Sequence, residues 1–207
     1  MILKLKTLGA MVALITPLLA APAMAATHLQ TINFDDINLG SQPYELIPSG
    51  YAGLNWGSNF YVLDSQQAPY LGTGYDNGTM SGSQVAFNGS GLPASFSALS
   101  GTLNFFGAYL TSAWLATDTV EVMGLRAGAT VFDQTVTITK DTAKLFQFNF
   151  SNVDTVKFVS QGNSQIAFDN VQISAVPEPE TYALLGLGAV GLLLRRRSRT
   201  FSLARSV

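Results

Sequence analysis

The sequence predicts an all-β fold, a two-sheet antiparallel β-sandwich of the jelly-roll type, between an N-terminal signal helix and a C-terminal transmembrane helix. Three observations support this. Short segments rich in Val, Ile, Thr, Phe and Tyr alternate with clusters of Gly, Asn, Asp and Ser from residue 30 to 174. No long segment of that region has the apolar periodicity of a helix. Cysteine is absent from the 207 residues, so packing alone must hold the fold.

Ten segments have the composition and spacing of strands. They are residues 29–34, 53–56, 60–63, 84–88, 101–110, 119–125, 130–139, 144–150, 155–161 and 165–174. Segment 155–161 alternates with period two, because Val156, Phe158 and Ser160 fall on one face. Alternation in segment 130–139 slips near Asp133, which predicts a β-bulge. Many short strands joined by glycine-rich turns favour a sandwich over a single open sheet.

The stretch from residue 70 to 83 is the most loop-like part of the domain, with four glycines that predict tight turns. Such a loop either carries binding function or simply connects two strands. Seven aromatic residues could stack on a sugar ring: Tyr51, Trp56, Tyr61, Tyr70, Tyr75, Tyr109 and Trp114. Because Trp56, Tyr61 and Tyr109 lie in expected strands, where aromatics usually pack in the core, Tyr70 and Tyr75 on the loop are the better exposed candidates.

Residues 1–25 have the pattern of a secretory signal peptide. Lys4 and Lys6 precede an apolar stretch over residues 8–20, and Ala23-Met24-Ala25 has the small-x-small pattern of a cleavage site. We expect signal peptidase to cut after Ala25. The alternative is an uncleaved N-terminal anchor, which the short apolar region disfavours.

The C-terminal segment has three parts in a strict order. Val176-Pro177-Glu178-Pro179 is extended because proline restricts its own backbone and that of its predecessor. Residues 182–194 are apolar throughout, and a cluster follows them that consists of Arg195, Arg196, Arg197 and Arg199. A thirteen-residue helix spans about 20 Å, less than the roughly 30 Å of a bilayer core, so it could also be a buried helix. Snorkelling arginines can extend a short span, and the positive-inside rule keeps them cytoplasmic.

This arrangement resembles the PEP-CTERM sorting signal, a tail also labelled as the C-terminal domain of ice-binding proteins. The resemblance implies that an exosortase recognises Val176, Pro177, Glu178 and Pro179. It also implies that residues 182–194 are an anchor in the inner membrane, either transient or permanent, before the protein reaches the cell surface or the exterior. Four regions result: signal peptide 1–25, exported domain 26–175, sorting and anchor segment 176–199, and tail 200–207. The last eight residues have no role that we can name.

The exported domain is acidic, with eleven acidic and four basic residues between positions 26 and 175 and a net charge of −7. That charge repels phosphate backbones and argues against binding of nucleic acid. Known catalytic motifs are absent, and His28 is the single histidine of the chain. Glu45 and Glu121 are the domain's two glutamates, and nothing in the sequence pairs them as glycosidase carboxylates. We expect a protein without enzymatic activity; a hydrolase of unrecognised geometry is the third alternative.

Asp35 and Asp36 follow the first expected strand, and Asp169 lies in the last one. First and last strands are often neighbours in sandwiches, so these carboxylates could converge. Two interpretations remain open. One is a structural calcium ion, as in carbohydrate-binding jelly rolls, which the domain loosely resembles. The other is that they are turn and strand-end residues that accept hydrogen bonds from their own backbone, and we expect no other cofactor.

These observations lead to two hypotheses about function. The first is an exported surface or matrix protein, sorted by an exosortase and associated with the exopolysaccharide of a biofilm. The second is a carbohydrate-binding module with a structural calcium ion. Signal peptidase and the exosortase are the expected partners during export, and exopolysaccharide is the expected partner afterwards.

Overall fold

The computed structural model describes residues 28–176 and 186–192. The first range belongs to one compact unit, and the second, a short helical stretch, belongs to another. The predicted signal peptide, the motif residues Pro177, Glu178 and Pro179, the arginine cluster and the tail lie outside the described residues. In the part of the chain that is described, no helix has the length and apolar character that crossing a membrane requires.

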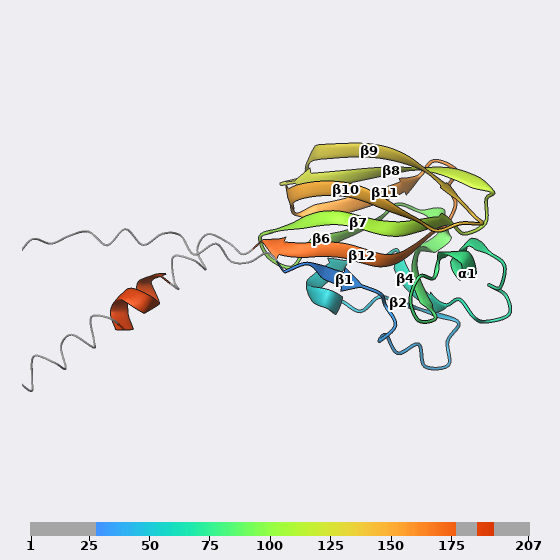
Figure 1. Cartoon of the computed structure of the whole chain (residues 1–207), viewed down its shortest axis with the longest axis horizontal. Helices are drawn as coiled ribbons and strands as arrows, with labels where there is room; N and C mark the ends of the chain where they lie inside the picture. Colours follow the sequence, from blue (N-terminus) through green and yellow to red (C-terminus); the bar gives the residue numbers. More distant parts are fainter. Residues whose placement is uncertain (1–27, 177–185, 193–207) are drawn as a thin grey trace, which may run out of the picture. The chain divides into compact units, whose positions relative to one another are not determined.

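Residues 28–176 form two antiparallel sheets, which confirms the predicted sandwich (Figure 1). The seven-stranded sheet has the order β10-β7-β12-β5-β4-β2, with β1 also paired to β12. Its strands are β1 (Gln30–Ile32), β2 (Tyr44–Leu46), β4 (Phe60–Asp64), β5 (Gln84–Asn88), β7 (Thr102–Ser112), β10 (Lys144–Val153) and β12 (Ile166–Val176). The five-stranded sheet has the order β3-β6-β11-β8-β9. Its strands are β3 (Leu54–Trp56), β6 (Ala94–Ala98), β8 (Thr117–Arg126), β9 (Ala129–Thr139) and β11 (Thr155–Ser160).

Each of the ten expected strands is present, with its ends moved by a few residues at most. Strands β2 and β6 were not among the expected strands. Strand β2 has three residues, none of them buried, and β6 is built largely from Ala and Ser, so neither has the composition of a strand. The predicted irregularity in β9 is a bulge at Val131, since Gly124 pairs with Phe132 while Leu125 pairs with Thr130.

A core of phenylalanine rings fills the space between the sheets. Phe158 of β11 is 1% exposed, and its ring centroid lies 4.9 Å from that of Phe168 on β12. Phe60, Phe96 and Phe105 surround the same ring at 5.9 to 6.3 Å. Tilted and edge-to-face rings of this kind contribute beyond the apolar area that they bury. Because the chain has no cysteine, the packing of this cluster, and not disulfide bonds, holds the two sheets together.

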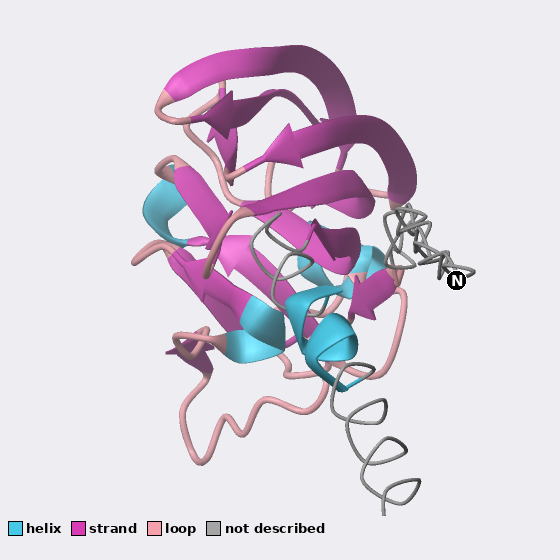
Figure 2. Ribbon diagram, turned by 90° about the vertical axis from the view of Figure 1, so that its left-hand side faces the viewer, coloured by secondary structure: helices cyan, strands magenta, loops and turns pink. Residues whose placement is uncertain are grey.

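The strand pairings define two opposite ends of the sandwich. At one end Val176, the last residue of β12, pairs with Thr102 at the start of β7. At the other end Ser112 of β7 pairs with Ile166 of β12. Helix α1 (Gly74–Gly78) packs against β7 and β12 near that second end (Figure 1). In the described part of this unit, the short helical segments lie in the connections between strands (Figure 2). Val176, the last described residue of β12, therefore lies at the end of the sandwich opposite α1 (Figure 1).

Replacing Phe158 by alanine should lower the free energy of unfolding by about 3–5 kcal/mol, because it opens a cavity among four other rings. Equilibrium urea unfolding followed by tryptophan fluorescence measures this loss. Val131→Ala on edge strand β9 is the control, since Val131 is 49% exposed and its truncation leaves no cavity. Equal losses in the two variants would contradict the assignment of the core.

Candidate functional site

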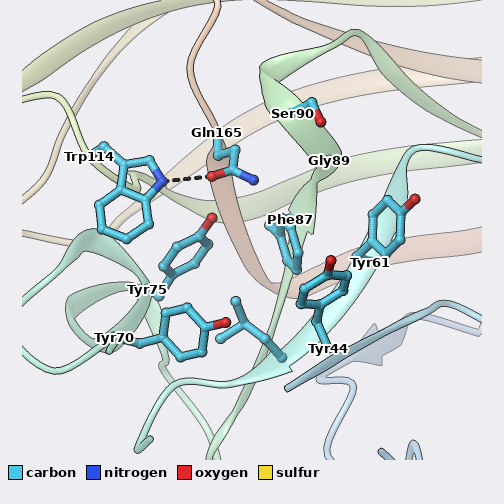
Figure 3. Close-up of a pocket in the computed structure, with 10 residues that line it drawn as sticks. Tyr44, Tyr61, Tyr70, Tyr75, Phe87, Gly89, Ser90, Trp114 and Gln165 are labelled. Carbon is cyan, nitrogen blue, oxygen red and sulfur yellow. Dashed lines mark hydrogen bonds between the residues drawn. The ribbon is translucent and has the colours of Figure 1, made fainter. Parts of the chain in front are cut away.

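A hollow of about 250 Å³ lies next to α1, on the outer face of the seven-stranded sheet (Figure 3). We call it the aromatic pocket. Six of its ten lining side chains are aromatic, and none of the ten is charged. The lining residues are Tyr44, Tyr61, Leu63, Tyr70, Tyr75, Phe87, Gly89, Ser90, Trp114 and Gln165.

Three neighbouring strands supply the first wall of the pocket. Alternation along β4 and β5 sends Val62 and Ala86 into the main core and turns Tyr61 and Phe87 to the outer face. Because Tyr61 and Phe87 are register partners, their rings stack at 5.5 Å. Tyr44 of β2 meets Tyr61 edge-on at 5.7 Å. The wall therefore follows directly from strand register.

The loop around α1 supplies the second wall. Tyr75 lies on α1 and packs edge-to-face against Phe87 at 5.5 Å, Tyr70 at 5.4 Å and Trp114 at 5.4 Å. Trp114, in the β7–β8 loop, donates a hydrogen bond from Nε1 to Oε1 of Gln165 at 2.6 Å. This bond occupies the oxygen of Gln165, so the amide nitrogen remains available to a ligand (Figure 3).

Local hydrogen bonds hold the α1 loop in place. Thr73 caps the helix, because its Oγ1 accepts from the backbone N–H of Tyr75 at 3.2 Å and donates to the carbonyl of Tyr70 at 2.5 Å. The N–H of Gly74 donates to the carbonyl of Ala113 at 2.9 Å. A Cβ atom at Gly74 would lie 1.8 Å from the carbonyl oxygen of Ser112, so only glycine allows α1 to approach β7 this closely. These contacts fix the loop as the second wall of the pocket. The loop was expected to contain tight turns, and it also contains the short helix α1.

The pocket combines buried and open aromatic rings. Trp114 and Tyr44 are each 48% exposed, whereas Tyr75 is 1% exposed. The prediction that Tyr75 is well exposed was therefore wrong, because α1 turns its ring inward against Phe87. Tyr70 is half-buried and lines the pocket. Burial raises the pKa of both Tyr70 and Tyr75, so their hydroxyls stay neutral at physiological pH.

Four of the seven aromatic candidates from the sequence line this pocket, namely Tyr61, Tyr70, Tyr75 and Trp114. Trp56 is buried in the main core instead, and Tyr51 packs partly against it. Tyr44, Phe87 and Gln165 also line the pocket but were not among the candidates from the sequence. Tyr44 belongs to the unexpected strand β2, and Gln165 precedes β12 in a position that only the fold brings beside Trp114.

Asp35 and Asp169 do converge, because β1 pairs with β12. They hold the segment from residue 80 to 84 through its backbone. Asp169 accepts from the N–H groups of Met80 at 2.6 Å and Ser81 at 2.9 Å, and Asp35 accepts from those of Ser83 and Gln84 at 3.0 and 3.1 Å. Both carboxylates thus bond to backbone N–H groups, but these four bonds belong to a distant segment and not to their own turn or strand end, which differs from the second interpretation.

Asp36 lies apart from this pair and accepts a hydrogen bond from the Tyr51 hydroxyl at 2.5 Å. Within the described residues, no three His, Asp or Glu side chains are placed to hold a metal ion. The calcium alternative therefore has no third carboxylate beside Asp35 and Asp169 among those residues.

Burial raises the pKa of Asp169 to about 6, against the lowering effect of the N–H groups of Met80, Ser81 and Asn170, and nearby Asp35 adds to the rise. A folded-state pKa above the unfolded value means that this group stabilises the fold most below about pH 4. That stability is lost as pH rises through about 6.

A carboxyl ¹³C NMR titration should show a midpoint near pH 6 for Asp169, and the amide signals of Met80 and Ser81 should shift with the same midpoint, because their protons face that carboxylate. The resonance assignment is checked with Asp169→Asn, in which the midpoint should disappear. A midpoint below pH 4 would contradict the dominance of burial.

Residues 175–197 match the PEP-CTERM protein-sorting motif. The match confirms the resemblance seen in the sequence and implies a surface protein that is exported and processed by an exosortase. Val176 is the second residue of the matched range and the last of β12. No curated protein matches the chain.

Two solved structures illustrate the similarity of fold. One is the N-terminal CBM22-1-CBM22-2 tandem domain of Xyn10C from Paenibacillus barcinonensis, 15% identical with a TM-score of 0.44 over 77% of this chain and 49% of that one. The other is the CBM22-1-GH10 part of xylanase 10B from Clostridium thermocellum, complexed with xylohexaose. It is 11% identical, with a TM-score of 0.42 over 74% of this chain and 29% of that one. The chain thus spans half or less of either protein, and likenesses this weak do not bear on what it binds.

Proposed function

We propose that this chain is a non-enzymatic surface protein whose sandwich, once sorted through its C-terminal motif, binds a neutral carbohydrate in the aromatic pocket. The observation that supports this most is the lining of that pocket, with six aromatic side chains and no charged one among its ten residues. Exopolysaccharide of the surrounding matrix is the proposed source of the ligand.

Carbohydrate fits the chemistry of the pocket better than other small ligands do. Sugar rings have apolar C–H faces that pack on aromatic rings, and hydroxyl groups at their edges that need hydrogen-bond partners. The half-exposed rings of Tyr44 and Trp114 are the aromatic surfaces on which such a sugar face would pack. The amide nitrogen of Gln165, the Ser90 hydroxyl and the tyrosine hydroxyls are the polar partners that could fix orientation.

The charge of the domain supports a neutral ligand. The exported region carries a net charge of −7, which disfavours uronic acids and other anionic sugars at long range. An anionic sugar would also need a cationic partner, and the ten lining residues supply none. The same lining lacks the carboxylate pair that glycoside hydrolysis requires, which supports binding rather than catalysis.

The position of the pocket suits display at a surface. Gln165 and Trp114 lie beyond the pair Ser112 and Ile166, at the end of the sandwich opposite Val176. A protein held through its C-terminal segment would therefore present the pocket away from its point of attachment.

Sorting is tested by expressing the full chain in a host that has an exosortase and in one that lacks it. Intact mass and cell fractionation should show a product trimmed near Pro177 and released to the surface only in the first host. Replacing Pro177 and Pro179 by alanine should abolish trimming, because it removes both prolines of the motif and the backbone restriction that proline imposes. Membrane-retained, untrimmed product in both hosts would contradict exosortase sorting and indicate a permanent anchor.

Binding is tested on a glycan array and then by calorimetry with the best neutral glycan. Trp114→Ala and Tyr44→Ala should each weaken binding by about tenfold or more, since truncating a central aromatic contact costs about 2 kcal/mol. Both side chains are half-exposed, so the variants should fold normally. Tyr109→Ala is the matched control, because Tyr109 is a partly exposed tyrosine outside the pocket.

Equal binding by all variants would contradict the pocket as the site. Exclusive binding of anionic polysaccharide would contradict the neutral ligand. Release of reducing sugar from any bound glycan would instead support the hydrolase alternative.

A further inference from the structure

A second hollow, of about 300 Å³, lies at the end of the sandwich where the sorting motif begins. We call it the exit hollow. Seven of its eleven lining residues are apolar, and none of the eleven is charged. They are Gln30, Ala52, Gly53, Leu54, Ala98, Leu99, Ser100, Thr102, Leu103, Ile173 and Ala175. Its lining is uncharged, as that of the aromatic pocket is, but it is richer in aliphatic side chains.

One leucine makes the surface of this hollow more apolar. Leu99 lines the hollow from the β6–β7 turn and is 60% exposed. Leucine at an exposed turn has no structural need that its own burial would explain. Leu29, which is 53% exposed, belongs to a different hollow, lined also by Phe106, Gln147, Asn149 and Gln172. The apolar surface at the exit hollow is therefore that of Leu99 and the other lining residues.

The exit hollow is continuous with the sorting motif. Ala175 lines the hollow and is also the first residue of the matched range 175–197. Strand β12 remains paired through Val176, which lies opposite Thr102, so Pro177 follows the fold without a linker. Three extended residues reach at most about 11 Å. An enzyme that holds Pro177, Glu178 and Pro179 must therefore come close to the rim of the sandwich.

We infer that the exit hollow, with the exposed Leu99 at its edge, is a second contact surface for the exosortase beside the motif itself. The inference rests on the sorting function proposed above. To hold the motif the enzyme must come up to the rim of the sandwich, and the uncharged apolar hollow that adjoins the motif is the surface that it meets there. The contact would let the enzyme hold the folded rim while it processes the adjacent segment.

The test measures the rate of tail trimming by pulse-chase and intact mass in the host that has an exosortase. Leu99→Asp should slow trimming by at least about fivefold, since a charge in the hollow opposes an apolar contact. Leu92→Asp is the matched control. Leu92 is 52% exposed and directly follows η2 (Gly89–Gly91). Two residues of η2, Gly89 and Ser90, line the aromatic pocket, so Leu92 lies away from the exit hollow.

A second arm separates direct contact from damage to the fold. Six Gly and Ser residues inserted between Val176 and Pro177 move the motif away from the hollow. In that background Leu99→Asp should have no further effect on the rate, whereas a folding defect would persist. A photo-crosslinking residue at position 99 should capture the exosortase; capture of lipid alone would overturn the inference in favour of a membrane contact.

The outcomes distinguish the two proposals. Untrimmed wild-type chain in the exosortase host would overturn sorting, and this inference with it. Trimmed wild type, with equal rates for Leu99→Asp and Leu92→Asp, would overturn the contact surface alone and leave sorting intact.

Discussion

The pairing of β12 with its neighbours is the constraint on which the rest of this structure depends. This strand pairs with β7, β5 and β1 within one sheet. Its side chains serve both faces, because Phe168 enters the phenylalanine core while Ala167 packs beneath the aromatic pocket. Its Asp169 holds the segment after α1, and its last residue begins the sorting segment. A change in the register of β12 would disturb the core, the pocket and the exit of the chain together.

The seven-stranded sheet is apolar on both faces over part of its area, and this explains how a small domain can build a pocket. The inner face packs on the second sheet, and the outer face carries a smaller cluster that contains Leu63, Val85 and Phe87. Helix α1 and Trp114 cover that cluster incompletely, which leaves aromatic rings open to solvent. The pocket is therefore the uncovered margin of a second, minor core, and part of its wall is also a packing surface of that core.

The two hollows lie at opposite ends of the same strands, and this separates their proposed roles. The aromatic pocket has open rings and polar tips suited to a hydrated neutral ligand. The exit hollow is apolar and adjoins the motif that the exosortase reads. Contact with the sorting enzyme at one end leaves the other end free, so export and ligand binding need not compete for one surface.

Strand composition and alternation sufficed to predict the sandwich, ten of its strands and the bulge in β9, because these depend on local periodicity. The order of prolines, apolar residues and arginines sufficed for the sorting motif, since that is a linear pattern. The aromatic pocket was only half predictable. Tyr70 was identified from its loop, but Tyr44 lies on a strand too short to detect, and Gln165 meets Trp114 only through the pairing of β7 with β12. Whether an aromatic ring points inward, as in Tyr75, or outward, as in Trp114, depends on packing between distant segments, which only the tertiary structure decides.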